Sequence, residues 1–504
     1  MSIAQPKIRL AELVATLSLG TDLGFGQPME HVIRQTLIAL RMSELLGLNE
    51  SERAVVYYSG LLAWVGCHTD AYEQAKWFGD DIRLKADTFL FAEPGPRFFL
   101  SHLGAGKPLF ARARQGVAFI GAMRRGDVID LTSHWTAADE LARRLGLGED
   151  VRESLKESYE RWDGKGVIGT RGEAIRLDSR LVSLADVIAV FHRSGGAEAA
   201  VEVAIERSGT HFDPALVELF CEHAPTLLAG LDTSSNWDTV IASKPRLGQP
   251  IPEDRFGDVL AAIGDFADLK SPYTIGHSRA VADLAAQAAR TFGLPPEETL
   301  AIRRAGMVHD IGRLGVANTI WDKRGKLTQA EFERVRLHPY LTERMLAFSP
   351  TLAALGAIAV LHHERQDGSG YPRGLSGDAI SNAGRILAAA DVYHAMLEIR
   401  PHRPARSSEQ AVSELRAEVT AGRLDGDAVA AVLRAAGHRV TQRRDWPDGL
   451  TTREVEVLRL VTLGYSNKDI AEQLSSHGKR RETTSSIFTP RSGSRTAHAR
   501  ASLR

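Results

Sequence analysis

Apolar residues in this chain recur at intervals of three and four positions along most of its length, whereas strand-like alternation is scarce. An α-helix brings residues with this spacing onto one face, and a strand would need a period of two. The stretch from Val281 to Phe292 is an example, because it carries one apolar stripe and is followed by Gly293, a residue typical of helix C-termini. The pattern predicts an all-α protein.

The helical pattern occurs twice along the chain. Shifting the N-terminal region by 246 residues, and then by 204 and 205 residues, superimposes residues of the same type in the same order. An ordered set of matches of this kind is the signature of a repeated domain. The matched pairs include His31 with His277, Gly60 with Gly306, His134 with His338, Asp163-Gly164 with Asp367-Gly368, and Asp186 with Asp391.

A chain of 504 residues is too long for one hydrophobic core. From the repeat we predict two tandem helical lobes, over residues 1–230 and 255–440. Residues 231–254 between them are rich in Ser, Pro and Gly, which is typical of a linker. A segment over 445–474 and a tail over 475–504 complete the predicted domain organisation.

The second lobe contains two adjacent pairs, His309-Asp310 and His362-His363, that are costly to bury unless they are hydrogen-bonded or bound to metal. Consecutive residues of a helix point about 100° apart, so the two members of a pair can serve neighbouring ions. One such histidine alone would be a satisfied core residue, whereas the whole set indicates a metal centre. The candidate ligands are His277, His309, Asp310, His338, His362, His363 and Asp391.

Imidazole and carboxylate ligands without thiolate suit Fe, Mn, Zn or Co. Two such ions about 3.5–4 Å apart activate a water and hold both oxygens of an in-line displacement at phosphorus. Asp310 then serves catalysis as well as metal binding, and Arg313, one turn further on, could neutralise a phosphate oxygen. The loop 367–372 contains two glycines and a proline, and we expect it to form an ordered turn at the rim of the site.

The first lobe has lost this chemistry. Ala63-Trp64 and Ser158-Tyr159 stand where the second lobe has its adjacent pairs. Only His31, His134 and Asp186 remain of the matched ligands, too few for two ions. We interpret this lobe as a degenerate, catalytically silent copy that serves in dimerisation, in packing against the second lobe or in ligand sensing, and a homodimer is left open.

The remaining composition excludes several classes of protein. The two cysteines, Cys67 and Cys221, exclude a disulfide scaffold and favour the cytoplasm. Although Cys67-His68 with Asp70 looks like a metal cluster, no partner cluster accompanies it, so a helix end entering a loop is preferred.

The net charge of −1 gives no field that attracts nucleic acid or membrane. No signal-peptide pattern is present, and the longest apolar run, 352–361, is too short to span a bilayer and is expected as a buried core helix.

The motifs His309-Asp310-Ile311-Gly312, His362-His363-Glu364 and Gly370-Tyr371-Pro372, in this order and spacing, resemble the HD-GYP family. Members of this family are helical, metal-dependent phosphohydrolases of the HD superfamily, and many hydrolyse cyclic di-GMP. The resemblance covers about 265–437 and implies a cyclic di-GMP phosphodiesterase with two divalent ions on the seven candidate ligands. The substrate-binding positions that it implies are Arg313, Asp367, Gly370, Tyr371 and Pro372.

Three positions depart from the family pattern. Arg313 stands at the usual phosphate-contacting lysine, and it keeps the charge but changes the geometry. Tyr273 stands where some members have a glutamate ligand for a third metal, which favours two ions. His394 stands where a second aspartate is usual, so we expect a weaker contact behind the ligands.

Residues 450–474 resemble the first half of the helix-turn-helix of LuxR-type transcription regulators. Thr451 and Glu454 form a capping-box pattern at the start of the first helix, and Gly464-Tyr465 is the predicted turn. In that family a recognition helix follows and enters the major groove of DNA. Here a basic, aperiodic tail follows at once, which we interpret as disordered. We hypothesise a reading-frame shift after Leu474, which resequencing of the gene would test.

Two functions are compatible with these features. The first is an enzyme that cleaves phosphodiesters, such as a cyclic dinucleotide. In the alternative, the lobes sense a nucleotide, the C-terminal segment contacts DNA, and there is little or no catalysis. The complete ligand set favours catalysis, and the LuxR-like segment favours regulation. The missing recognition helix weakens any sequence-specific DNA binding and leaves the DNA-contacting residues unassigned.

Overall fold

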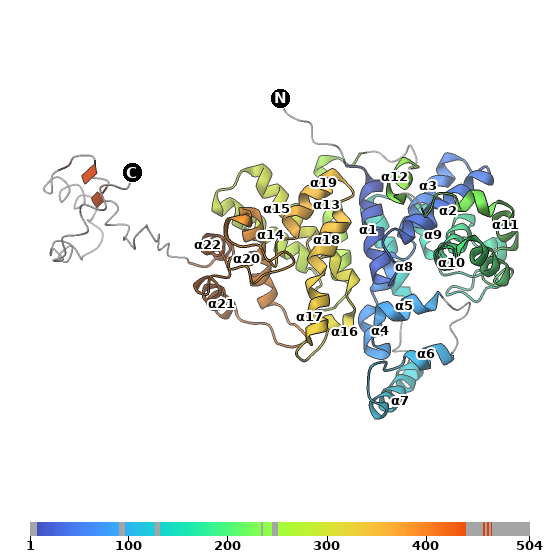
Figure 1. Ribbon diagram of the computed structural model, residues 1–504, viewed down its shortest axis with the longest axis horizontal. Coiled ribbons are helices and arrows are strands. Elements are labelled where there is room, and N and C mark those ends of the chain that lie inside the picture. Colours follow the sequence, from blue (N-terminus) through green and yellow to red (C-terminus); the bar gives the residue numbers. More distant parts are fainter. Residues whose placement is uncertain are drawn as a thin grey trace. The chain divides into compact units, whose positions relative to one another are not determined.

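Every regular element that the structure describes is a helix. The computed structural model describes residues 8–89, 96–125, 132–232, 235–243 and 250–439, together with 457–458, 461–462 and 465. Within these residues the only β-type pairings are isolated bridges. Figure 1 shows the helices of the two lobes, coloured from blue to orange along the chain. The all-α prediction is therefore confirmed.

The chain divides into two units after His438. The first unit contains both predicted lobes. In the second unit, residues 457–458 and 461–462 are helical and Tyr465 is exposed. The other residues of the predicted helix-turn-helix, and the whole predicted tail over 475–504, lie outside the described residues.

Twelve of the described α-helices, α1 to α12, lie before residue 243 and make up the first lobe. Its centre is the packing of α2 against α3 and α10. The helices are α1 (Leu10–Gly24), α2 (His31–Leu45), α3 (Glu50–Leu62), α4 (Ala71–Phe78), α5 (Asp81–Thr88), α6 (Pro96–His102), α7 (Leu109–Arg125), α8 (Thr132–Leu145), α9 (Glu149–Lys156), α10 (Leu177–Glu206), α11 (Pro214–Leu228) and α12 (Asn236–Ala242), with the 3-10 turns η1 (Val65–His68) and η2 (Gly172–Ala174).

The second lobe repeats this arrangement, since α14 packs against α15 and α20 as α2 packs against α3 and α10. The tandem helical fold is thus confirmed. The elements are α13 (Glu253–Asp268), α14 (His277–Phe292), α15 (Pro296–Val308), η3 (Ile311–Gly315), α16 (Asn318–Trp321), α17 (Gln329–Arg336), α18 (His338–Leu346), α19 (Pro350–Ala359), η4 (Gly377–Ala379), α20 (Asn382–Leu397), α21 (Ser408–Thr420) and α22 (Gly426–Ala435).

The first helix that carries a matched histidine begins in the same way in both lobes. His31 is the first residue of α2 and His277 is the first residue of α14. A buried aspartate accepts hydrogen bonds from the backbone N–H groups at each of these helix starts, Asp22 in the first lobe and Asp268 in the second. A carboxylate at this end satisfies donors that have no partner within the helix and fixes where the histidine lies.

Two local predictions are confirmed by the helix boundaries. Gly293 ends α14 with φ of 96°, a left-handed conformation that favours glycine. The apolar run 352–361 falls largely on α19, where Leu352 and Ala359 are fully buried. None of the described helices combines the length and the hydropathy that a membrane span requires.

The stretch predicted as a linker is partly helical. It contains α12, whose residues Trp237 and Val240 are buried. The helix packs against α2, and the Trp237 ring lies 4.9 Å from that of Phe348 in the second lobe. The predicted boundaries of the lobes remain our proposal. Helix α12 contacts both lobes, so it connects them as a packed element.

The two lobes share one hydrophobic core. Buried residues of both lobes belong to the same cluster, including Leu17 of α1 and Met345 of α18. Helix α1 lies directly against η3 and α18, the elements that follow the His309-Asp310 pair and begin with His338. The first lobe is therefore part of the packing that supports the predicted metal ligands.

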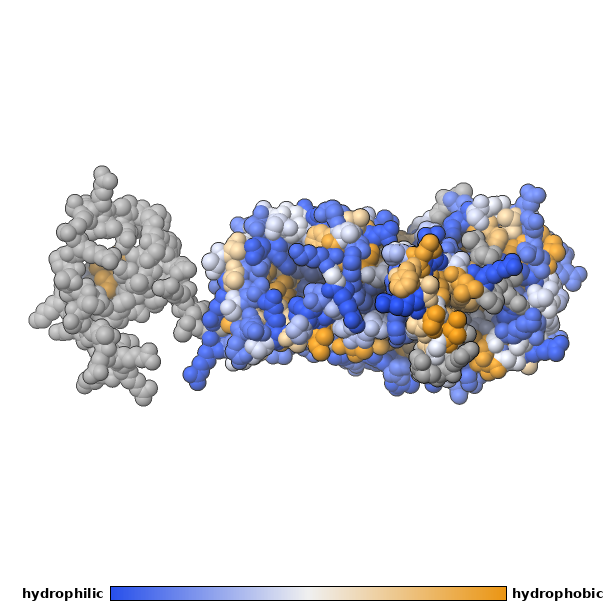
Figure 2. All heavy atoms as spheres, turned by 90° about the horizontal axis from the view of Figure 1, so that it is seen from below, coloured by the Kyte–Doolittle hydropathy of each residue, from blue (hydrophilic) through white to orange (hydrophobic). Residues whose placement is uncertain are grey.

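Helix α7 presents an apolar face to solvent. Its residues Leu109, Phe110, Val117 and Ile120 are each more than half exposed. Helices α6 and α7 lie at the bottom of the first unit in Figure 1, and Figure 2 shows this unit from below. Orange, apolar atoms gather on this side.

A buried charged network also joins the lobes. The carboxylate of Asp81, which is fully buried, lies 3.2 Å from Nζ of Lys270 and 3.7 Å from Nζ of Lys85. Its other oxygen accepts a hydrogen bond of 2.7 Å from the backbone N–H of Asn318. Asn318 in turn donates to the Lys270 carbonyl and to Asp322. Asp81 thus anchors the start of α16 in the second lobe.

We predict that Asp81→Ala lowers the free energy of unfolding by roughly 3–5 kcal/mol, because it leaves two buried ammonium groups without their partner. Chemical denaturation followed by circular dichroism measures this loss. Asp139→Ala is the control, since Asp139 pairs with Arg152 at the surface and its removal should change little. An unchanged denaturation midpoint in Asp81→Ala would show that the network does not hold the lobes together.

Candidate metal centre

The seven candidate ligands are brought together where helices of the second lobe begin and end. His277 and His338 are the first residues of α14 and α18. His309 follows the last residue of α15, and the His362-His363 pair follows α19. Asp391 lies within α20. Residues at helix ends can face a common point from several directions, which no single helix face could provide.

Gly312 allows two of these elements to approach closely. A Cβ atom at this position would lie 2.1 Å from the carbonyl oxygen of His338 and 2.6 Å from the backbone nitrogen of Thr342. The Gly312 N–H donates to the Thr342 hydroxyl, and this hydroxyl donates to the His309 carbonyl. The turn after His309 is therefore tied to the helix that begins with His338.

The Asp310 carboxylate lies at the middle of the cluster. Its Oδ2 is 3.8 Å from Nε2 of His277 and 3.7 Å from Nε2 of His309. Its Oδ1 is 3.3 Å from Nε2 of His338 and 3.6 Å from Nε2 of His362. The two oxygens thus face two different pairs of imidazoles.

Asp391 also faces both sides of the cluster. Its Oδ1 is 3.2 Å from Nε2 of His277, and its Oδ2 is 3.8 Å from Nδ1 of His363. Three sets of ligand atoms within 4.8 Å of one another contain all seven predicted ligands. The sets are His277, His309 and Asp391; His309, Asp310 and His362; and His338, His362 and His363.

Three histidines are held in the tautomer that a metal requires. Nδ1 of His309, His338 and His362 donates to the carbonyl of the residue three positions earlier, at 2.7, 2.6 and 2.6 Å. Because the proton is on Nδ1, the lone pair of Nε2 points into the cluster. Such a backbone partner is the usual support of a metal-binding imidazole.

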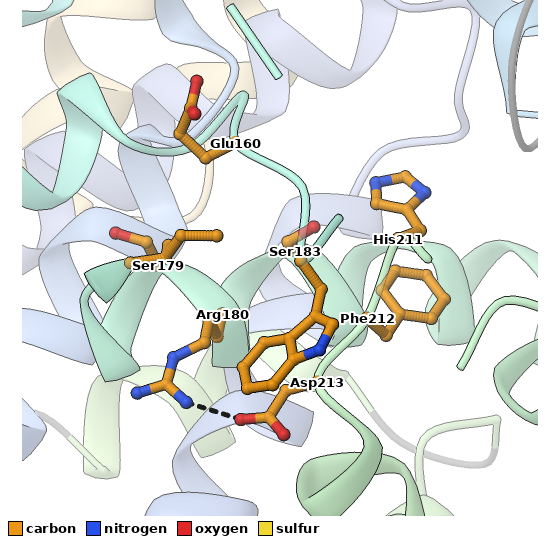
Figure 3. Close-up of a pocket in the computed structure, with 9 residues that line it drawn as sticks. Glu160, Ser179, Arg180, Ser183, His211, Phe212 and Asp213 are labelled. Carbon is orange, nitrogen blue, oxygen red and sulfur yellow. Dashed lines mark hydrogen bonds and ion pairs between the residues drawn. The ribbon is translucent and has the colours of Figure 1, made fainter. Parts of the chain in front are cut away.

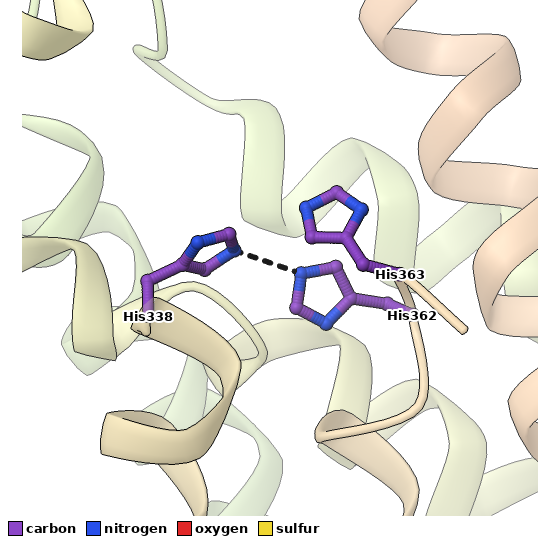
Figure 4. A group of neighbouring side chains, drawn as sticks. All are labelled: His338, His362 and His363. Carbon is purple, nitrogen blue, oxygen red and sulfur yellow. Dashed lines mark hydrogen bonds between the residues drawn. The ribbon is translucent and has the colours of Figure 1, made fainter. Parts of the chain in front are cut away.

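The free nitrogens fit a cation. Nε2 of His309 is buried without a hydrogen-bond partner among the described residues. Nε2 of His338 lies 3.1 Å from Nε2 of His362, as the dashed line in Figure 4 shows, with His363 beside them. Two imidazole lone pairs at this distance need a proton or a metal ion between them. The donor set of imidazoles and carboxylates suits a divalent transition metal.

The electrostatics favour the ligand protonation states of His362, Asp310 and Asp391. Burial, with the neighbouring imidazoles of His309 and His338, lowers the pKa of His362 to about 3, so this ring is neutral. Burial alone would raise the pKa of Asp310 and Asp391, but the surrounding histidines, together with Arg313 at Asp310, outweigh it and hold both values below the ordinary range. Neutral imidazoles and ionised carboxylates are what a metal binds.

His277 has a partner behind it that the sequence did not reveal. Its Nδ1 lies 3.1 Å from the Glu398 carboxylate, which also lies 3.2 Å from Nδ1 of His394 and 2.5 Å from Nη2 of Arg400. Burial disfavours the charged ring, yet the bonds to Asp391 and Glu398 raise the pKa of His277 to about 10. A metal ion would displace the proton on Nε2 while Glu398 holds Nδ1.

A signal for Glu398 was present in the spacing. Asp391, His394 and Glu398 stand at positions i, i+3 and i+7, which share one face of α20 and its end. His394, for which we expected a weaker contact behind the ligands, lies 3.2 Å from Glu398. Asp268 was also missed, although it matches Asp22 at the same shift of 246 residues that relates His31 to His277.

Two arginines lie beside the cluster. Nη1 of Arg313 is 3.3 Å from Oδ2 of Asp310, and its guanidinium lies 3.8 Å over the Trp321 ring. Arg400 is largely buried, and burial together with the nearby charge of Arg313 lowers its pKa. Arg400 had not been identified from the sequence. Both side chains carry positive charge to the edge of the centre.

The loop predicted at the rim is only partly at the site. The Tyr371 ring lies 4.7 Å from that of His363, and Pro372 follows it. Gly370 is buried, and a Cβ there would lie 2.4 Å from the backbone nitrogen of Arg365. Asp367 is exposed and accepts hydrogen bonds from Ser369, so it shapes the turn and is not brought to the ligands.

The matched positions of the first lobe hold no comparable group of metal ligands among the described residues. The ligands that remain there bind one another or neighbours: His31 lies 3.0 Å from Asp186, and His134 lies 2.9 Å from Asp70. Cys67 lies 2.8 Å from the Tyr159 hydroxyl, while His68 contacts the Phe266 carbonyl.

Comparison with known proteins agrees with this geometry. The HD domain family matches residues 262–428, and the luxR family of bacterial regulatory proteins matches residues 448–476. A 3′3′-cGAMP-specific phosphodiesterase of Vibrio cholerae is 33% identical over 82% of this chain and 92% of its own length. A cyclic di-GMP phosphodiesterase response regulator of Xanthomonas campestris is 36% identical over 36% of this chain and 48% of its own.

A crystal structure of a cyclic GMP-AMP-specific phosphodiesterase from V. cholerae superimposes with a TM-score of 0.59 at 28% identity, over 86% of this chain and 98% of that one. The chain therefore belongs to the HD-GYP family of metal-dependent phosphohydrolases, and it is a hydrolase of the phosphodiesterase class with a LuxR-type segment at its C-terminal side.

We predict that His309→Ala combined with Asp310→Ala abolishes metal binding, because it removes the central carboxylate and a buried Nε2 donor. Elemental analysis of the purified chain measures the metal content. His223→Ala, on the exposed part of α11, is the control and should keep the full content. Metal retained in the double variant would contradict the assignment of the centre.

Proposed function

We propose that the second lobe holds two divalent ions and uses them to hydrolyse a 3′,3′-linked cyclic dinucleotide. The observation that carries this proposal is the position of Asp310, whose two oxygens face separate pairs of imidazoles. One ion would be bound by His277, His309, Asp310 and Asp391. The other would be bound by Asp310, His338, His362 and His363.

Fe, Mn, Zn and Co are the candidate ions for this donor set. When bound, such a pair activates water and stabilises negative charge on phosphate oxygens. The chain's own residues then orient the reaction. The backbone carbonyls behind His309, His338 and His362 fix the ring planes, and Glu398 fixes His277. Ligands held in this way do not need to reorganise when the substrate arrives.

Arg313 is the proposed contact for the phosphate. Its guanidinium stacks on Trp321 and reaches Asp310, so its side chain is fixed before the substrate binds. A planar fork can bind two oxygens of one phosphate, which the lysine usual in this family cannot do. Arg400 adds a second positive charge nearby, and Tyr371 with Pro372 would border the substrate next to His363.

The choice of substrate is supported by relatives. The resemblance to the HD-GYP motifs suggests cyclic di-GMP, and relatives that cover about a third of this chain carry that name. The relative that covers most of this chain carries the name of 3′3′-cGAMP. Since both ligands have the same 3′,5′ phosphodiester links, we propose that the centre acts on this link, and that a substrate panel decides between the bases.

We predict that Arg313→Ala lowers kcat/KM for cyclic di-GMP and 3′3′-cGAMP by about 100-fold, the loss expected for one fixed donor at a developing negative charge. Hydrolysis of both compounds and of a simple phosphodiester, with metal content measured in parallel, tests this. Arg416→Ala, at an exposed position of α21, is the matched control. Full activity in Arg313→Ala with normal metal content would exclude this role.

The LuxR-type match supports a second role, contact with DNA. The family's recognition helix is missing from the sequence after Leu474, so base contacts are not expected. The tail contains several Lys and Arg residues and only one acidic residue, Glu482. We infer that any DNA binding is of the phosphate-backbone type, which depends strongly on salt.

We predict that the chain retards duplex DNA in a gel at low salt without sequence preference, and that about 0.2 M salt abolishes the shift because counterion release no longer favours binding. A chain ending at Pro447 should not retard DNA at any salt. A shift that survives competition by unrelated DNA would instead establish a sequence-specific regulator, the alternative function.

Two further features of the chain are proposed. The exposed apolar face of α7, on a chain with a net charge of only −1, supports association of two copies. The two free cysteines, Cys67 and Cys221, support a cytoplasmic location.

A further inference from the structure

A cavity of about 260 Å³ opens in the first lobe at the place that corresponds to the metal centre of the second. Trp64, Ser158, Tyr159 and Asp186 line it, and these positions match Asp310, His362, His363 and Asp391 in the repeat. The residues that replaced the ligands have therefore not filled the space.

The walls of this first-lobe cavity are aromatic. The rings of Trp64 and Tyr159 lie 5.5 Å apart at a steep angle, and Phe25 lies 6.1 Å from both Trp64 and Phe89. Hydrogen bonds hold two of these rings in place, from Trp64 to Gln35 and between Tyr159 and Cys67. Fixed aromatic faces at an open cavity are suited to stack against a planar ring.

Arg207 brings a buried positive charge to the same cavity. Arg207 is the residue directly after α10, and it is 3% exposed. Nη2 lies 3.4 Å from the Phe89 carbonyl, and the guanidinium lies 5.4 Å from the Phe191 ring. Its Nε has no hydrogen bond, and no carboxylate of the described residues forms an ion pair with it. A guanidinium remains charged, so burying it without a counter-ion is costly.

The other charged groups around the cavity have partners. Arg161 pairs with Asp163 at 2.9 Å, and Asp186 pairs with His31 at 3.0 Å. Glu160 accepts hydrogen bonds from two backbone N–H groups, those of Ile168 and Thr170. Arg207 is therefore the lining cation that forms no ion pair with a described carboxylate, although the charge of the adjacent Glu206 acts on it.

Figure 3 shows a small pocket beside the first-lobe cavity, and its charged residues are also compensated or neutral. Arg180 is bound to Asp213, as the dashed line shows, so its charge is compensated. His211, which lines both this small space and the first-lobe cavity, has its pKa lowered to about 3 by burial and by Arg161 and Arg207. It is neutral at physiological pH and adds no charge of its own.

We propose that this cavity binds a mononucleotide, with the base against Trp64 and Tyr159 and the phosphate on Arg207. The aromatic walls alone would suit any flat ligand, but a buried guanidinium without an ion-pair partner favours an anion, and a guanidinium can bind phosphate through two parallel hydrogen bonds. The volume lies just below the usual range for ligand sites, so the cavity has room for no more than one nucleotide. The inference does not depend on hydrolysis by the second lobe.

The test is titration calorimetry of the full chain with GMP and AMP in the presence of a metal chelator. Arg207→Gln should weaken binding of the nucleotide at least tenfold, and guanosine and inorganic phosphate should each bind the unaltered chain at least tenfold more weakly than GMP. Arg313→Gln is the matched control, because it removes an arginine from the metal centre of the second lobe and should leave the affinity within twofold. Circular dichroism establishes that each variant is folded.

Trp64→Phe provides an independent measurement, which tests the proposal even if Arg207→Gln does not fold. The nucleotide should quench the tryptophan fluorescence of the unaltered chain, and Trp64→Phe should lose this quenching while its calorimetric affinity falls less than fivefold. Three results would overturn the proposal: no binding of GMP or AMP, equal affinity in folded Arg207→Gln, or loss of binding in Arg313→Gln in place of Arg207→Gln.

Discussion

The negative charge of Asp310 governs the second lobe. A fully buried carboxylate is tolerated only with compensating groups, and here four imidazole nitrogens lie within 3.8 Å of its oxygens. Each of these imidazoles belongs to a different element, so that α14, α15, α18 and α19 must all end or begin at this carboxylate. His277 is the member of this set whose pKa is raised, to about 10, and a bound metal would supply positive charge in place of its proton.

The helices reach this point through a repeated device. A carboxylate caps the first histidine-bearing helix of each lobe, and in the second lobe Gly312 lets the next turn touch the backbone of His338. Main-chain carbonyls then set the ring tautomers. The site is thus oriented mainly by backbone atoms, which do not change when side chains are substituted. This accounts for a first lobe that keeps the helical framework without the ligands.

The sequence was sufficient for those parts of the site that follow from local pattern. Helical periodicity gave the all-α fold, and the spacing of the His-Asp and His-His pairs identified the seven residues that the structure brings together. Glu398 and Arg400 were missed because their roles depend on His277 and Arg313, which belong to other elements. Asp268 was missed because the repeat was not followed back to Asp22, although its hydrogen bonds to Ser278 are local. Asp367 was placed at the site because of its motif, although its carboxylate forms a local turn with Ser369. The spacing of residues along one helix can be read from the sequence, whereas contacts between side chains of different helices cannot.

The common hydrophobic core of the two lobes constrains how such a duplicated chain can change over generations. A surplus copy is normally free to be deleted, but removal of α1 and Asp81 would expose the underside of η3 and α18 to water and leave Lys270 buried without its counter-charge. The fold of the second lobe therefore depends on the presence of the first. The cavity around Trp64 is lined by first-lobe residues alone, so replacement of the former ligands there removes no contact that α1 or Asp81 makes with the second lobe.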